Sequence, residues 1–295
     1  MIKPLSPLPL SLCLLLLCYG AAGGPPTPAT LILTNFASAP FPHPERAQGH
    51  HYHDEFYSAA EHYNDSTVAL FAPTNFHPSG RIDFVVHFHG WRNNVTNVLE
   101  KYCVLDQFSA SHRDAILIVP QGPRDAPDSF GGRLEDTNGF ARFMDEAMRD
   151  LRDRGVIGDA KIGRIILSGH SGGYEVISAI LERGGMTDRV QEVWLFDALY
   201  AHAERFVVWF DHHKGRFIDL YTEHGGTKDE TENLMAALRE NGVPFFAATD
   251  TAATDADLRK RHLVFLFSET PHDELLQTRN LFQRFLDTSS LKAGK

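Results

Sequence analysis

The sequence predicts an α/β fold, a doubly wound and mostly parallel sheet of eight strands with helices on both faces. Short apolar runs alternate along the chain with amphipathic stretches at helical spacing. This alternation is typical of a parallel sheet, whose buried strands read as nearly continuous apolar runs between crossover helices. No internal repeat or low-complexity linker interrupts the alternation. We therefore expect one domain over residues 24–295, preceded by a leader in residues 1–23.

The leader has the composition of a secretory signal peptide. Lys3 supplies a positive charge, residues 10–17 form an apolar core, and small residues typical of a cleavage site follow at 20–23. The apolar core is too short to span a membrane in the usual way. We therefore expect a secreted protein, periplasmic or extracellular, without a membrane span.

Charge and cysteine usage exclude further classes of protein. The chain has 28 basic and 38 acidic residues, a formal net charge of −10, and no basic stripe. Nucleic acid and anionic membrane surfaces are therefore not expected partners. Cys13 and Cys18 lie in the leader, which leaves Cys103 without an internal disulfide partner. Cys103 falls on a helical stretch, where we expect it to be a small buried residue.

The spacing of apolar residues along the chain predicts where each strand and helix begins and ends. The predicted strands are residues 29–34, 67–72, 82–88, 115–120, 165–168, 193–196, 216–221 and 262–267. The predicted helices are residues 97–112, 134–155, 172–183, 201–210, 231–241 and 274–286. In such sheets the chemistry lies beyond the carboxyl ends of the strands, so the residues that follow each strand are the candidates for a site.

One motif dominates the chain. The fifth strand is followed by Gly169-His170-Ser171-Gly172-Gly173, and a helix begins directly after it. Strand, sharp turn and helix with a serine at the apex form a nucleophile elbow. The glycines let this strained turn fit against the strand and the helix. The motif therefore predicts Ser171 as a catalytic nucleophile.

The chain resembles the α/β-hydrolase family in this elbow, in a His-Gly loop after the third strand, and in a histidine after the last strand. The resemblance covers nearly the whole chain after the leader. It implies that the backbone N–H groups of Trp91 and Gly172 bind an oxyanion, at ~3–4 kcal/mol per donor. It also implies that His272 takes the proton from Ser171 and later gives it to the leaving group.

The acid that orients His272 has two candidates. Asp197 ends the sixth predicted strand, and Glu223 follows the seventh. The family most often uses the seventh-strand position, but a buried Asp197 at an abrupt strand end needs a partner, and a histidine would supply it. We favour Asp197, with Glu223 as the alternative acid. Helix capping by Asp197 is the competing structural explanation.

Several polar clusters have alternative interpretations. His87 and His89 form a His-x-His pair that zinc sites also use. The histidines between His43 and His53 match no standard ligand set, so a polar surface loop is favoured over a metal site. We therefore predict no metal and no cofactor. The loop over 120–136 lies beside the elbow, and its candidates for substrate contact are Phe130, Arg133, Glu135 and Asp136. A solvated connection is the alternative for this loop.

Together these features predict a secreted serine hydrolase that cleaves a carboxylic ester, small or polymeric, through an acyl-enzyme. Within the family, the compact secreted form is similar to esterases and to polyester or feruloyl-ester depolymerases. An amidase or peptidase would use the same residues, and a non-catalytic binding module would keep the same fold. The sequence leaves the acyl group, the alcohol and the choice of ester or amide open.

Overall fold

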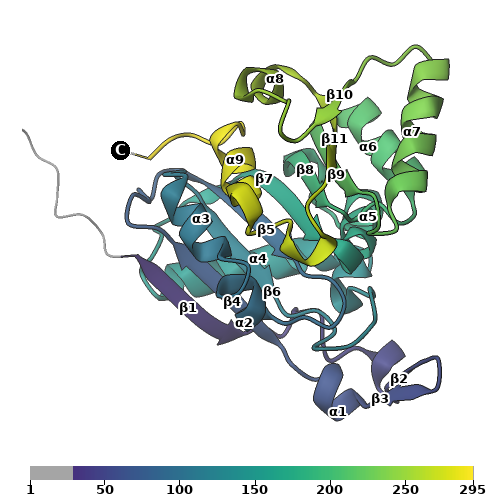
Figure 1. The fold of residues 1–295 in the computed structure, drawn as a ribbon. Coiled ribbons are helices and arrows are strands. Elements are labelled where there is room, and N and C mark those ends of the chain that lie inside the picture. The colour runs from purple at the N-terminus through teal and green to yellow at the C-terminus, as the bar shows by residue number, and fades with distance from the viewer. Residues whose placement is uncertain (1–28, 295) are drawn as a thin grey trace, which may run out of the picture.

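The computed structural model of the chain describes residues 29–294 and is built around a nine-stranded sheet (Figure 1). The predicted leader lies outside the described residues. The strand order is β1-β4-β6-β5-β7-β8-β9-β11-β10. β4 (Thr67–Ala72) runs antiparallel to both its neighbours, β1 (Thr30–Asn35) and β6 (Ile116–Pro120), and the other neighbouring pairs in this sheet are parallel.

The predicted sheet, α/β and mostly parallel, is confirmed, and each predicted strand coincides with a strand of the structure. The remaining strands are β5 (Arg81–Phe88), β7 (Lys161–His170), β8 (Val190–Phe196), β9 (Arg216–Thr222), β10 (Phe246–Thr249) and β11 (Leu263–Ser268). The predicted count of eight is wrong by one, because β10 is a four-residue edge strand. Its four residues alternate between half-buried and exposed positions.

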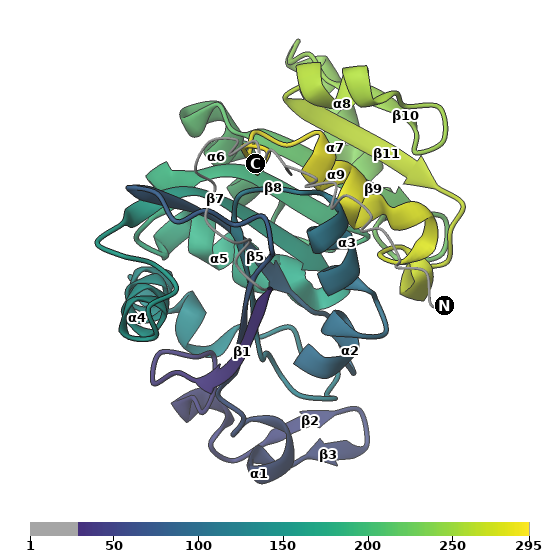
Figure 2. The same cartoon turned by 90° about the vertical axis from the view of Figure 1, so that its left-hand side faces the viewer.

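Helices cover both faces of the sheet, as predicted (Figures 1 and 2). One core lies under α4 (Gly139–Asp153), α5 (Tyr174–Arg183), α6 (Ala203–His213) and α7 (Lys228–Glu240). The other lies under α2 (Val95–Leu99), α3 (Val104–Ala110), α8 (Asp255–Lys260) and α9 (Leu281–Asp287). Neighbouring residues of one strand, such as Val85 and Val86, pack into opposite cores, because side chains alternate across a strand. None of the helices within residues 29–294 is long and apolar enough to cross a membrane.

Two predicted helices are interrupted by residues in the left-handed region. The helix predicted over 97–112 divides into α2 and α3 at Cys103, which has a φ of 53°. The expectation that Cys103 is a buried helical residue is therefore wrong, since it is half-buried and precedes α3. The predicted last helix starts late for the same reason, because Arg279 and Asn280 have φ values of 58° and 51°.

The segment between β1 and β4 forms an antiparallel hairpin rather than the predicted polar loop. Its strands are β2 (His50–Tyr52) and β3 (Glu55–Tyr57), and α1 (Ala59–His62) follows (Figure 1). A small separate core joins the hairpin segment to the loop after β6. It consists of Phe41, Tyr57, Tyr63 and Ala126. The hairpin is thereby fixed beside the loop that we expected to line the site.

Candidate active site

Ser171 lies at the apex of a strained turn between β7 and α5. Its φ is 53°, a left-handed conformation that costs a non-glycine residue about 1–3 kcal/mol. The glycines on either side are required by close packing: a Cβ on Gly169 would lie 2.7 Å from Ile177 Cδ1, and one on Gly173 would lie 2.7 Å from the carbonyl oxygen of Phe88. The elbow therefore has the geometry that its sequence predicts.

The loop after β5 passes directly against Ser171. A Cβ on Gly90 would clash with the Cβ of Ser171 and lie 2.9 Å from its Oγ. Within residues 29–294, the backbone N–H of Trp91 has no hydrogen-bond acceptor. Such an N–H beside the serine is available to an oxyanion, as is the N–H of Gly172 at the start of the elbow helix.

His89 fixes the conformation of this loop. Its Nδ1 donates to the carbonyl oxygen of Gly90 at 2.9 Å, and its Nε2 accepts from the backbone N–H of Gly122 at 3.0 Å. The side chain of Gln121 also lies 2.9 Å from Nε2. Burial lowers the pKa of His89, so the ring is neutral and both nitrogens have protein partners. His89 therefore holds the loop in place.

His87 has different partners from His89. Its Nδ1 lies 2.9 Å from Ser168 Oγ, and burial lowers its pKa to about 3. The histidines of the hairpin region do not converge with this pair. Over the described range, 29–294, no three His, Cys, Asp or Glu side chains are grouped closely enough to hold a metal ion.

The loop after β11 brings His272 to the end of β8. Nδ1 of His272 lies 2.7 Å from Oδ2 of Asp197. The Asp197 side chain is completely buried, whereas that of His272 is 25% exposed. Ser171 and His272 are not joined by a hydrogen bond within residues 29–294. In unliganded enzymes such bonds are often long and tighten only with substrate.

Two threonines that the sequence analysis did not identify complete the surroundings of Asp197. Thr222 donates to the carboxylate from both its backbone N–H, at 3.2 Å, and its hydroxyl, at 2.6 Å, and Thr227 donates from its hydroxyl. Burial raises the pKa of Asp197, but hydrogen bonds from His272 and the two threonines outweigh it and leave the pKa below its usual value. The carboxylate is therefore ionised. A threonine at the end of a strand, like Thr222, or before a helix, like Thr227, is too common for its position to reveal this role.

Glu223 lies elsewhere. Its carboxylate accepts from Lys228 Nζ at 2.7 and 2.9 Å, and its side chain is 49% exposed. Hydrogen bonding to Lys228 lowers the pKa of Glu223. Of the two candidate acids, the structure brings Asp197 and not Glu223 to His272.

His170, the residue before Ser171, contacts His272 in the loop after β11. Its Nε2 donates to the carbonyl oxygen of His272 at 3.0 Å, and the two rings lie 4.7 Å apart with an interplanar angle of 31°. Burial, reinforced by His272, lowers the pKa of His170 to about 4, so the ring stays neutral. The sequence analysis missed this residue, although it occupies the variable position of the elbow motif.

Tyr200 closes the opposite side of the elbow. Its hydroxyl donates to the carbonyl oxygen of Gly225 at 2.5 Å, and the phenol lies beside the Ser171 side chain. Burial raises the pKa of Tyr200 to about 12, so it is a neutral phenol at ordinary pH.

The residues expected to line the site in the loop over 120–136 have mixed positions. Phe130 is partly exposed and packs against Phe41 and the ring of His43. Glu135 is buried, accepts from the backbone N–H of Gly131 at 2.5 Å, and has a pKa raised to about 7 by burial. Asp136 pairs with His43 and Arg142, and Arg133 donates its backbone N–H to the carbonyl oxygen of Pro40. Glu135 therefore makes a contact within the loop, whereas Asp136 pairs with residues outside it.

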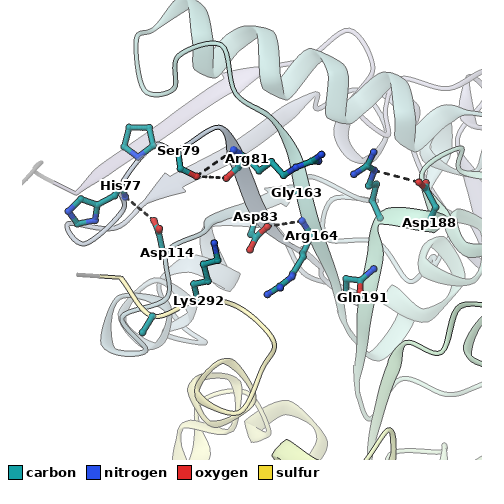
Figure 3. Close-up of a pocket in the computed structure, with 13 residues that line it drawn as sticks. His77, Ser79, Arg81, Asp83, Asp114, Gly163, Arg164, Asp188, Gln191 and Lys292 are labelled. Atoms are coloured by element: carbon teal, nitrogen blue, oxygen red, sulfur yellow. Dashed lines mark hydrogen bonds and ion pairs between the residues drawn. The ribbon is translucent and has the colours of Figure 1, made fainter.

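A polar hollow of about 670 Å³ lies at the opposite end of the strands from Ser171 (Figure 3). It is lined by the amino ends of β5 and β7, whereas Ser171 follows the carboxyl end of β7. Its acidic groups have partners, since Asp83 accepts from the backbone of Arg164 and Asp114 from that of His77. The hollow contains none of the candidate catalytic residues.

Comparison with known proteins extends these observations. No protein-family model matches the chain, and no curated protein sequence matches it. Solved structures do match: a ferulic acid esterase superposes with a TM-score of 0.54 at 12% identity, covering 88% of this chain and 98% of its own. A serine-to-alanine mutant of the feruloyl esterase module from Clostridium thermocellum, complexed with sinapinate, gives 0.54 at 9% identity, covering 90% and 89%. The protein thus has an α/β-hydrolase fold, and its structural neighbours are carboxylic ester hydrolases.

Proposed function

We propose that the protein is a secreted serine hydrolase that cleaves a carboxylic ester, small or polymeric, with Ser171 as nucleophile, His272 as base and Asp197 as acid. The observation that carries this proposal is the contact of His272 with the buried, ionised Asp197, beside a strained serine elbow. A buried carboxylate on one ring nitrogen fixes the tautomer in which the other nitrogen accepts a proton.

The reaction proceeds in two balanced halves. His272 Nε2 takes the proton from Ser171 Oγ as that oxygen bonds to the carbonyl carbon, and the carbonyl oxygen becomes an oxyanion held by the N–H groups of Trp91 and Gly172. The imidazolium gives its proton to the leaving alcohol, and an acyl-serine remains. Water, deprotonated by His272, then attacks the acyl-serine, and the proton returns to Ser171 as the acid leaves.

Three further residues support this arrangement. Thr222 and Thr227 keep Asp197 ionised, and His89 keeps the oxyanion loop against Ser171. None of these steps uses a metal or an organic cofactor. Secretion is proposed from the leader at residues 1–23, whose composition is that of a signal peptide.

Hydrolysis by the purified chain tests the proposal. We expect turnover of a short p-nitrophenyl ester and much slower turnover of a peptide amide. Ser171→Ala should lower kcat by about 10⁵–10⁶ while leaving the circular dichroism spectrum unchanged. A variant that keeps a tenth of wild-type turnover would exclude Ser171 as nucleophile. Preferential cleavage of the amide would make the protein a peptidase or amidase with the same catalytic residues.

A further inference from the structure

Trp91 presents an apolar surface beside the proposed nucleophile. The residue is 42% exposed, yet its indole Nε1–H already donates to Ser129 Oγ at 2.7 Å. The exposed part of the indole is therefore ring carbon, which gains free energy when another apolar group covers it. The bond to Ser129 also holds the ring in one orientation, which lowers the entropic cost of binding against it.

The exposed indole is continuous with the catalytic elbow on one side and with the hairpin on the other. A Cβ on Gly172, the residue after Ser171, would lie 2.8 Å from Trp91 Cδ1. The ring of Tyr52, at the end of β2, lies 5.0 Å from the indole at 75°, an edge-to-face pair. Trp91 and Tyr52 thus form one surface, the aromatic wall, that begins one residue from the nucleophile.

The position of the aromatic wall relative to His272 determines which half of an ester it faces. Ser171 follows β7, Trp91 follows β5 on one side of β7, and His272 follows β11 on the other side. The leaving oxygen must point toward His272, which protonates it, and the carbonyl oxygen must point toward the backbone N–H groups. The acyl chain is the remaining substituent, and the side away from His272 holds the aromatic wall.

Two ion pairs lie beside the aromatic wall. Arg92 lies 3.7 Å from the carboxylate of Glu55, and Arg46 donates to Asp128 at 2.7 Å. No unpaired cation or carboxylate among these four side chains is available to neutralise a charged ligand. The wall itself consists of two aromatic rings, which favour contact with an uncharged ring.

We propose that the aromatic wall of Tyr52 and Trp91 is an acyl subsite that binds an uncharged aromatic ring in the acyl part of the ester. This proposal rests on the proposed function. Edge-to-face or offset stacking of a substrate ring on the wall contributes more than the burial of an aliphatic group of equal size. Tyr52 is then a residue that determines specificity without taking part in bond breaking.

Tyr52→Ala and Phe56→Ala form a matched pair of variants on the hairpin. Phe56 is 55% exposed and is paired in register with His51, whereas Tyr52 is paired with Glu55. Because alternate residues of a strand point to opposite faces, Phe56 lies on the other face from Tyr52. Its removal tests whether loss of any aromatic residue from the hairpin has the same effect.

The experiment compares methyl 3-phenylpropanoate, methyl 3-cyclohexylpropanoate and methyl acetate as substrates. We expect Tyr52→Ala to lower the ratio of kcat/KM for the phenyl ester to kcat/KM for the acetate about tenfold. The cyclohexyl-to-acetate ratio should fall much less, and Phe56→Ala should leave both ratios unchanged.

Three results would overturn the aromatic subsite. One is equal loss on all three esters in Tyr52→Ala, one is equal loss on the phenyl and cyclohexyl esters, and one is the same change in Phe56→Ala. Failure of the wild-type chain to hydrolyse any of the three would instead overturn the proposed function and the subsite with it. The two proposals therefore fail in distinguishable ways.

Discussion

Asp197 and His272 meet across 2.7 Å at the boundary between the protein core and the solvent. The carboxylate is completely buried and ionised, and the imidazole that contacts it is 25% exposed. A buried carboxylate without partners is costly, so its hydrogen bonds to a histidine and two threonines stabilise the folded chain as well as orienting the ring.

Exchange of each candidate acid for its amide tests which of them orients His272. Asp197→Asn should lower kcat by ~10³–10⁴. An amide favours the wrong tautomer of the imidazole, and it does not stabilise the imidazolium that forms during the reaction. Glu223→Gln should lower kcat by no more than roughly tenfold, since this side chain contacts Lys228 at the surface. Steady-state kinetics of both variants under one set of conditions gives the ranking. The reverse ranking would make Glu223 the acid and leave Asp197 as a structural carboxylate.

His170 is expected to position His272 through its Nε2–H. His170→Phe keeps a ring against the imidazole but loses the donor to the carbonyl of His272, and His170→Gln keeps a donor at nearly the same place. We expect the phenylalanine variant to lose about tenfold in kcat with little change in KM, and the glutamine variant to recover most of that loss.

The pH–rate profile separates positioning by His170 from a general effect on stability. A misplaced His272 should change the apparent pKa of the kcat profile in the phenylalanine variant, and the glutamine variant should resemble the wild type. Equal kinetics in the two variants, or a loss that follows thermal stability alone, would show that the hydrogen bond from His170 has no role in catalysis.

Asp219 makes stability depend on pH. Burial, with repulsion from Asp197, raises its pKa from 3.8 to about 7, although Thr231 donates to it at 2.6 Å. The folded chain therefore keeps a proton that the unfolded chain releases above about pH 4, and stability falls as pH rises from about 4 to about 7. Asp219→Asn should remove this loss, which is on the order of a few kcal/mol.

Urea unfolding of the wild type and Asp219→Asn at pH 4.5 and pH 7.5 measures this difference. The variant should gain stability relative to the wild type at the higher pH. A difference between the two proteins that is independent of pH would show that Asp219 is ionised in the folded chain.

Chelators are expected to leave hydrolysis intact. In the described part of the chain His87 and His89 have different partners: Ser168 contacts His87, and the backbone of Gly90 and Gly122 contacts His89. Activity should therefore be the same before and after incubation with EDTA or phenanthroline. Loss of activity that added zinc restores would support a zinc hydrolase instead.

Most of the sheet could be predicted because its buried strands contain continuous apolar runs, as β6 and β11 do. The hairpin could not, because its stability comes from contacts with distant residues such as Phe41 and Ala126. The breaks at Cys103 and Arg279 were missed for a similar reason: a left-handed residue other than glycine leaves no signal in the hydrophobic period.

Within the candidate site, residues that belong to a motif or follow a strand were identified, and residues defined by contact alone were not. Ser171 and His272 stand out because of where they lie in the order of elements. Thr222, Thr227 and the ring contact of His170 depend on the way the loops fold back on Asp197 and His272. Sequence spacing contains no information on such contacts.

Covalent labelling with a fluorophosphonate shows whether Ser171 is an activated nucleophile. The reagent phosphonylates only a serine that is activated by a base and faces an oxyanion site, so it reports the nucleophile itself. Peptide mapping of the labelled chain should place a single adduct on Ser171, and Ser171→Ala and His272→Ala should both abolish it. Failure of the wild-type chain to react, or an adduct on another serine, would exclude Ser171 as the nucleophile.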